Sequence, residues 1–208
     1  MALSDLLNLS NNRKKIGLSE ERVRAVLPAA RQYVAFWREY PDLFIDFLCT
    51  GGDSEVKADF KFYFYQRVFL RAAMRYRYAY MTFPRAYSKS FLSVMILMVR
   101  CVLYPGAKLF VTSGGKEQSA QIIKEKVGEI CTLIPAFSRE INWDRGKTQE
   151  GKDYCKYLFK NGSYFDNVAA KEGSRGKRRH GGLVEECVGV DGKILQEVII
   201  PRFWGLAA

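Results

Sequence analysis

Residues 78–90 read Tyr-Ala-Tyr-Met-Thr-Phe-Pro-Arg-Ala-Tyr-Ser-Lys-Ser, and a long apolar stretch follows them. The aromatic residues of 78–83 predict a short strand, Pro84 begins a tight loop, and a helix is expected from Lys89 to Leu103. Strand, tight loop, Lys-Ser pair and helix are the parts of a phosphate-binding loop. In such a loop, backbone N–H groups and the helix N-terminus hold the phosphates, the lysine reaches their oxygens, and the next hydroxyl ligates magnesium.

The loop departs from the usual motif Gly-x-x-x-x-Gly-Lys-Ser/Thr. Lys89 and Ser90 occupy the last two positions, but Ser88 stands where the motif has glycine, and no glycine stands five residues before Ser88. Glycine is preferred there because the backbone must approach the phosphate closely. A basic helix start on the protein surface would carry the same Lys-Ser pair, so the loop alone leaves both interpretations open.

A second element ends in two adjacent carboxylates. The segment Gly181-Gly182-Leu183-Val184 predicts a short apolar strand, and Glu185 and Glu186 follow it directly. In a strand-based nucleotidase the first carboxylate holds magnesium and the second orients and activates the attacking water. Successive residues at a strand end point in different directions, so Glu185 can face the metal and Glu186 the γ-phosphate. A solvated acidic strand end would look alike, but the two elements together favour an NTPase.

The order of the predicted elements favours an α/β fold. A strand at 108–112 leads through a Ser-Gly-Gly loop into a helix at 116–133, and strands at 154–159 and 163–168 flank an Asn-Gly turn. We expect a P-loop NTPase-like domain with a mostly parallel central sheet flanked by helices. The domain organisation that we predict is a mobile N-terminal arm at 1–18, a helical N-terminal segment at 19–59 and the ATPase domain at 60–208.

Composition limits the classes of protein. The chain has 208 residues, 48% hydrophobic and 26% charged, which excludes disordered, collagen-like and disulfide-scaffold proteins. The formal net charge of +11 favours polyanionic partners without choosing between DNA, RNA and a membrane surface. One histidine, His180, and five dispersed cysteines argue against a zinc site. The sequence has no signal-peptide pattern and no apolar run that could span a bilayer, so we expect a soluble cytoplasmic protein that is not secreted.

Several segments, in this order, resemble the large terminase subunit, the ATPase of tailed-phage and related viral DNA-packaging motors. Phe64-Tyr65-Gln66 resembles the family's adenine-recognising glutamine motif, and residues 84–90 resemble its deviant phosphate loop. Residues 109–120 resemble its next strand and helix, and the run from Asn161 to Glu186 resembles the approach to its carboxylate motif. The resemblance spans 60–201, most of the chain.

The resemblance implies ATP and Mg²⁺ as cofactors and a role for each matching residue. Gln66 would contact adenine, and the phosphate loop would consist of Pro84, Arg85, Ala86, Tyr87, Ser88, Lys89 and Ser90. Ser90 and Glu185 would hold magnesium, and Glu186 would be the catalytic base. Arg175 would be an arginine finger that enters a neighbouring subunit and neutralises charge on the γ-phosphate. Two alternatives stay open: Arg175 belongs to a solvated basic loop, or Arg85 supplies the charge within one subunit.

The implied function is an ATP-hydrolysing motor domain that drives double-stranded DNA into a viral procapsid in the host cytoplasm. Its implied partners are the portal protein, the small terminase subunit and further copies of the chain in a ring. Ser88 and Glu185 depart from the family, which has glycine and aspartate there. The family's coupling motif and nuclease domain would lie beyond Ala208, so we expect an N-terminal ATPase fragment without nuclease activity. The alternatives are a helicase-like ATPase and a basic DNA-binding module with a degenerate nucleotide site.

Overall fold

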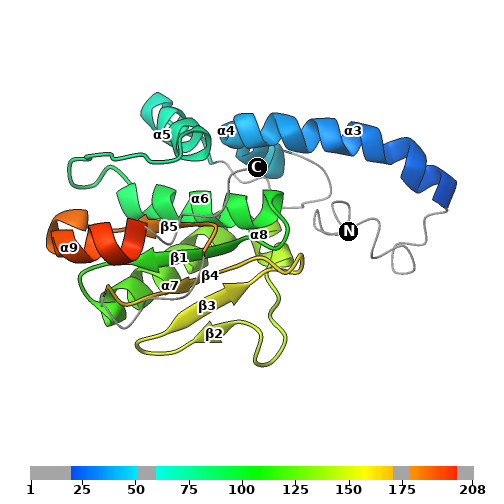
Figure 1. Ribbon diagram of the computed structural model, residues 1–208. Helices are drawn as coiled ribbons and strands as arrows, with labels where there is room; N and C mark the ends of the chain where they lie inside the picture. Colours follow the sequence, from blue (N-terminus) through cyan, green and yellow to red (C-terminus); the bar gives the residue numbers. More distant parts are fainter. Residues whose placement is uncertain (1–19, 51–59, 171–178, 201–208) are drawn as a thin grey trace.

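The computed structural model describes residues 20–50, 60–170 and 179–200. Its fold is mixed α/β, an open five-stranded sheet flanked by helices (Figure 1). One face of the sheet packs against α6 (Lys89–Leu103), α7 (Lys116–Leu133) and α8 (Pro135–Glu140). The other face is covered by α9 (Gly192–Ile194) and the π-helical turn η3 (Leu195–Ile199), with the short 3-10 turn η2 (Cys187–Gly189) after the last strand. Three helices lie on the side of α6 away from the sheet: α3 (Glu20–Glu39), α4 (Pro41–Thr50) and α5 (Phe64–Arg75).

The sheet has the strand order β2-β3-β4-β1-β5. These strands are β1 (Lys108–Thr112), β2 (Gln149–Glu150), β3 (Cys155–Leu158), β4 (Tyr164–Asn167) and β5 (Gly181–Val184). β1 is parallel to β4 and β5, whereas β3 is antiparallel to β2 and β4. The sheet is therefore mixed: the central strands β4, β1 and β5 are parallel to one another, as expected, and β3 adds antiparallel pairs with β2 and β4. The cause is the turn at Asn161-Gly162, where Gly162 has φ +83°, because a tight hairpin forces its two strands to be antiparallel.

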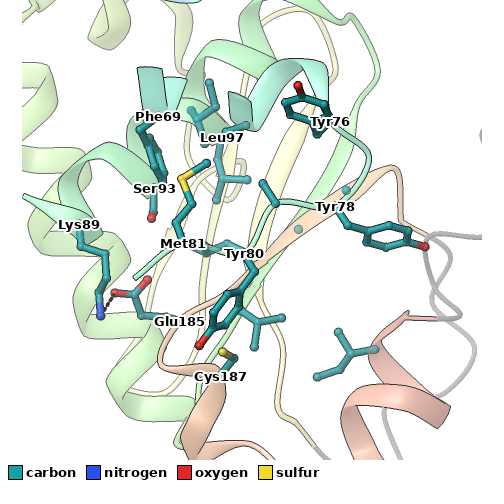
Figure 2. Close-up of a pocket in the computed structure, with 18 of the residues that line it drawn as sticks. Phe69, Tyr76, Tyr78, Tyr80, Met81, Lys89, Ser93, Leu97, Glu185 and Cys187 are labelled. Atoms are coloured by element: carbon teal, nitrogen blue, oxygen red, sulfur yellow. Dashed lines mark ion pairs between the residues drawn. The ribbon is translucent and has the colours of Figure 1, made fainter. Parts of the chain in front are cut away.

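The strand predicted at 78–83 does not form. Within the described chain β5 is the last strand of the sheet, and residues 76–83 line one side of a groove of about 1130 Å³ with β5 on the other side (Figure 2). Tyr78 and Tyr80 are 54% and 72% exposed. A segment becomes a strand only by hydrogen bonding to a neighbouring strand. The aromatic pattern does not specify that neighbour, which is why the prediction failed.

Helix α6 forms the centre of the core. Every residue from Phe91 to Val99 is buried, because the helix lies between the sheet and the outer layer of α3 and α5. Complete burial of a side chain such as Leu92 or Met95 contributes roughly 1.5–3 kcal/mol. This packing fixes the first turn of α6, which carries Lys89 and Ser90. No helix in the described ranges combines the length and the apolar character that a membrane span requires.

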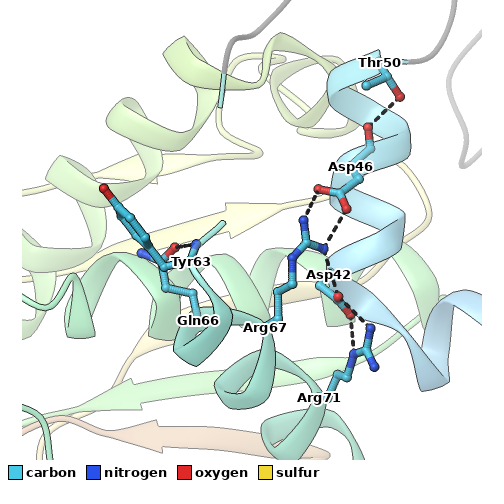
Figure 3. Close-up of polar contacts among 7 residues, drawn as sticks. All are labelled: Asp42, Asp46, Thr50, Tyr63, Gln66, Arg67 and Arg71. Carbon is cyan, nitrogen blue, oxygen red and sulfur yellow. Dashed lines mark hydrogen bonds and ion pairs between the residues drawn. The ribbon is translucent and has the colours of Figure 1, made fainter. Parts of the chain in front are cut away.

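Paired charges join α4 to α5 (Figure 3). The carboxylate of Asp42, which is 0% exposed, accepts hydrogen bonds from Arg71 at 2.8 Å and from Arg67 at 3.0 Å, and Arg67 also donates to Asp46 at 2.7 Å. Burial raises the pKa of Asp42, but the hydrogen bonds from the two guanidinium groups outweigh it, so the pKa lies below its ordinary value. The network fixes the start of α5, where Gln66 lies.

Candidate functional site

The two sequence elements with nucleotide-site chemistry meet in the structure. Ser90 Oγ donates a hydrogen bond to Glu185 Oε1 at 2.6 Å, although the two residues are 95 positions apart. Lys89 Nζ lies 3.5 Å from the same oxygen, and Figure 2 draws this ion pair. Glu185 is only 3% exposed, so the hydroxyl and the ammonium group compensate a carboxylate that has lost most of its water.

The parallel pairing of β1 and β5 positions Glu185. Thr112 is the register partner of Val184, and the N–H of Glu185 donates to the carbonyl oxygen of Thr112 at 2.8 Å. A Cβ atom on Gly182 would lie 2.6 Å from Cδ1 of Phe110, too close for any real side chain. The absence of a side chain at Gly182 therefore allows the Phe110 ring to pack over β5. Glu185 follows β5 directly and so lies at the C-terminal edge of the sheet.

The loop before α6 has backbone conformations that usually require glycine, although it contains no glycine. Ser88, the N-cap of α6, has φ +54° and ψ +26°, in the left-handed region. Ala86 also has positive φ, at +67°. The first intrahelical acceptor is the carbonyl of Ser88, which accepts from the N–H of Leu92 at 2.9 Å, and the N–H groups of the first turn have no acceptor within the helix. These donors beside Lys89 make the start of α6 suitable for an anion.

Glu186 lies at the rim of the same site. It is exposed, has φ +51°, and lines the groove together with Lys89 and Glu185. Its carboxylate accepts a hydrogen bond from Nε2 of Gln118 at 3.3 Å. Sequence reasoning assigned no role to Gln118. The sequence feature that could have identified Gln118 is its position in the first turn of a helix that follows a parallel strand. The first turns of such helices lie together at one edge of the sheet.

The remaining predicted residues lie around this centre. Gln66 is 5% exposed, and its Oε1 accepts a hydrogen bond from the N–H of Tyr63 at 2.9 Å, which caps α5 (Figure 3). The structure therefore uses Gln66 in a helix cap. The loop residues Pro84, Arg85, Ala86 and Tyr87 are exposed. Arg175 lies outside the described residues.

The oxygen groups of the site fit magnesium. Mg²⁺ prefers oxygen ligands, and the Ser90 hydroxyl and Glu185 carboxylate offer two within 2.6 Å of each other. In the described parts of the chain no three His, Cys, Asp or Glu residues form a cluster that could hold a metal. Magnesium held by Ser90 and Glu185 would complete its coordination with phosphate oxygens and water, as is usual for this ion in nucleotide sites.

Comparison with solved structures shows a likeness to a phage ATPase domain. The chain resembles the large terminase ATPase domain of Thermus phage P74-26, with a TM-score of 0.43 and 18% sequence identity. The matched region covers 57% of this chain and 51% of that chain, so the likeness extends over about half of the phage domain. The resemblance is distant. No protein-family model matches the sequence, and no curated protein matches it.

Proposed function

We propose that this chain binds and hydrolyses ATP, and that it is the motor domain of a large terminase subunit that moves double-stranded DNA into a viral procapsid. The observation that carries the ATPase proposal is the convergence of Lys89 and Ser90, at the start of α6, on Glu185, at the end of β5. A helix-start Lys-Ser pair facing a strand-end carboxylate supplies the groups that nucleotide hydrolysis needs. The motor role rests on the ordered terminase-like motifs of the sequence.

In the proposed reaction each residue has one task. Lys89, whose side chain is 37% exposed, leaves Glu185 and binds the β- and γ-phosphate oxygens together with the N–H groups of the first turn of α6. Ser90 and Glu185 would hold Mg²⁺, which would supply positive charge to neutralise the phosphates. Glu186 accepts a proton from the water that attacks the γ-phosphorus. The bond from that phosphorus to the β–γ bridging oxygen breaks, and ADP and inorganic phosphate leave.

The proposed partners follow from charge and from the terminase-like motifs. A net charge of +11 supports binding to the phosphate backbone of duplex DNA. The portal protein and the small terminase subunit are partners by the same resemblance, with a ring of copies around the DNA. In that ring Arg175 completes the site of a neighbour, unless Arg85 supplies the same charge within its own subunit.

The variant Glu186→Gln tests this function. An amide keeps the shape of the carboxyl group but accepts no proton, so the variant should bind MgATP like the wild type and lose about 100-fold or more in phosphate release. Glu117→Gln is the matched control, because Glu117 is another exposed carboxylate at the start of a helix, in the first turn of α7. Phosphate release by Glu186→Gln at the wild-type rate would show that Glu186 is not the base.

A further inference from the structure

A row of aromatic rings joins the phosphate loop to α5. Tyr87 lies 5.3 Å from Tyr65 between ring centroids, Tyr65 lies 6.4 Å from Phe83, and Phe83 lies 5.5 Å from Phe69. Phe69 is 9% exposed and anchors the inner end, whereas Tyr87 at the outer end is 46% exposed. Tyr63 adds a ring that is nearly parallel to Tyr65, at 6.1 Å and 9°. The row is therefore a supported aromatic surface that is open at Tyr87.

The backbone on both sides of Tyr87 is strained. Ala86 and Ser88 have φ values of +67° and +54°, which residues with a side chain rarely adopt. Strained residues that persist are held by their surroundings, and they cluster at ligand sites. Here the strain turns the loop so that the Tyr87 ring packs against Tyr65, while Lys89 two residues later points to Glu185.

The loop therefore presents two different surfaces side by side. The start of α6 offers Lys89 and backbone N–H groups for phosphates, and Tyr87 offers a flat ring. A flat aromatic surface that adjoins an anion site matches a nucleoside triphosphate, which has a planar base at one end and phosphates at the other.

We infer that Tyr87, supported by Tyr65, is the surface on which the nucleobase of the bound nucleoside triphosphate stacks. The inference rests on the proposed ATPase function and assigns the Tyr87 side chain to the base, whereas the backbone of the loop holds the phosphates. Every base has a π-face, so Tyr87 contributes affinity without selecting the base. Loss of the Tyr87 ring should weaken the binding of ATP and the binding of GTP by the same factor.

Isothermal titration calorimetry with two ligands tests the inference. MgATP carries phosphates and a base, whereas magnesium tripolyphosphate carries phosphates alone. Tyr87→Leu should bind MgATP about tenfold more weakly than the wild type and bind tripolyphosphate equally well. Tyr87→Phe keeps the ring and should bind both ligands like the wild type. Tyr33→Leu is the matched control, because Tyr33 is a 60% exposed tyrosine on α3 outside the site.

A fluorescent variant gives a second readout. Tyr87→Trp keeps a stacking surface, and ATP should quench its added emission, whereas tripolyphosphate should not. Equal MgATP binding by Tyr87→Leu and the wild type would overturn the inference and leave the proposed ATPase intact. An equal loss for both ligands would also overturn it, because Tyr87 would then shape the phosphate loop only. A wild type that binds neither ligand would instead refute the proposed function, and the inference with it.

Discussion

Replacing Ser88 by glycine should stabilise the protein. Ser88 has φ +54°, which costs a residue with a side chain about 1–2 kcal/mol. Glycine adopts this conformation without that cost. It destabilises the folded state by about 0.5–1 kcal/mol, however, because the unfolded chain has greater conformational freedom with glycine. The central values of the two ranges, about 1.5 and about 0.75 kcal/mol, leave a net gain in the free energy of unfolding of about 0.75 kcal/mol. With a typical dependence of about 2 kcal/mol per molar urea, the midpoint of unfolding should rise by about 0.4 M.

Urea unfolding followed by tryptophan fluorescence measures this difference. Ser93→Gly is the matched control, because Ser93 lies inside α6 in the ordinary helical conformation, where glycine costs roughly 1 kcal/mol. The two variants should therefore shift the midpoint in opposite directions. Ser88→Gly should also bind MgATP at least as well as the wild type, since glycine is the usual residue of the motif. A midpoint that falls as far for Ser88→Gly as for Ser93→Gly would refute the left-handed conformation of the loop.

Three further predictions concern DNA, assembly and acid stability. Binding to duplex DNA should weaken steeply with salt and depend little on sequence, because backbone phosphates supply the contacts, and strand separation in an unwinding assay would favour a helicase-like ATPase instead. Mixing Arg175→Ala chains with Glu186→Gln chains should restore some ATPase activity. The Glu186→Gln chain still carries Arg175 and can supply it to a neighbouring Arg175→Ala chain, whose Glu186 is intact. Mixtures as inactive as either variant alone would argue against an arginine finger that acts in trans. The folded pKa of Asp42 lies below its ordinary value, so its stabilising contribution is present above an ordinary pKa of about 3.9 and is lost as the pH falls through the folded pKa. Asp42→Asn should lower the free energy of unfolding by about 2 kcal/mol at neutral pH, a loss that is moderated because both arginine partners are partly exposed. The variant should also lose less stability than the wild type as the pH falls. An equal loss of stability in acid would contradict the lowered pKa of Asp42.

Local sequence signals predicted the elements that depend on local physics. The apolar run after Lys89 predicted α6, which spans Lys89–Leu103, and the loop before Lys116 predicted the start of α7. The Asn-Gly turn predicted the β3–β4 hairpin, because that dipeptide tolerates positive φ. These features depend on periodicity, turn chemistry and capping, which a short stretch of sequence contains.

Features that depend on distant partners were harder to predict. The 78–83 segment has strand composition but no strand, because pairing needs a neighbour that composition does not identify. The prediction that Ser90 and Glu185 hold the same ion stays a prediction, and the structure shows that their side chains are in hydrogen-bond contact. The capping role of Gln66 and the contact of Gln118 with Glu186 depend on side-chain positions that no motif specifies.

The direct test of the central claim is titration of the wild type and Lys89→Ala with MgATP. Lys116→Ala is the matched control, because Lys116 begins the neighbouring helix α7 and pairs with Asp153 at 2.9 Å rather than with Glu185. The account predicts that the wild type and Lys116→Ala bind MgATP equally, and that Lys89→Ala remains folded and binds at least about tenfold more weakly. Equal affinity of Lys89→Ala and the wild type, or no binding by the wild type, would contradict the claim that the start of α6 and Glu185 form a nucleotide site.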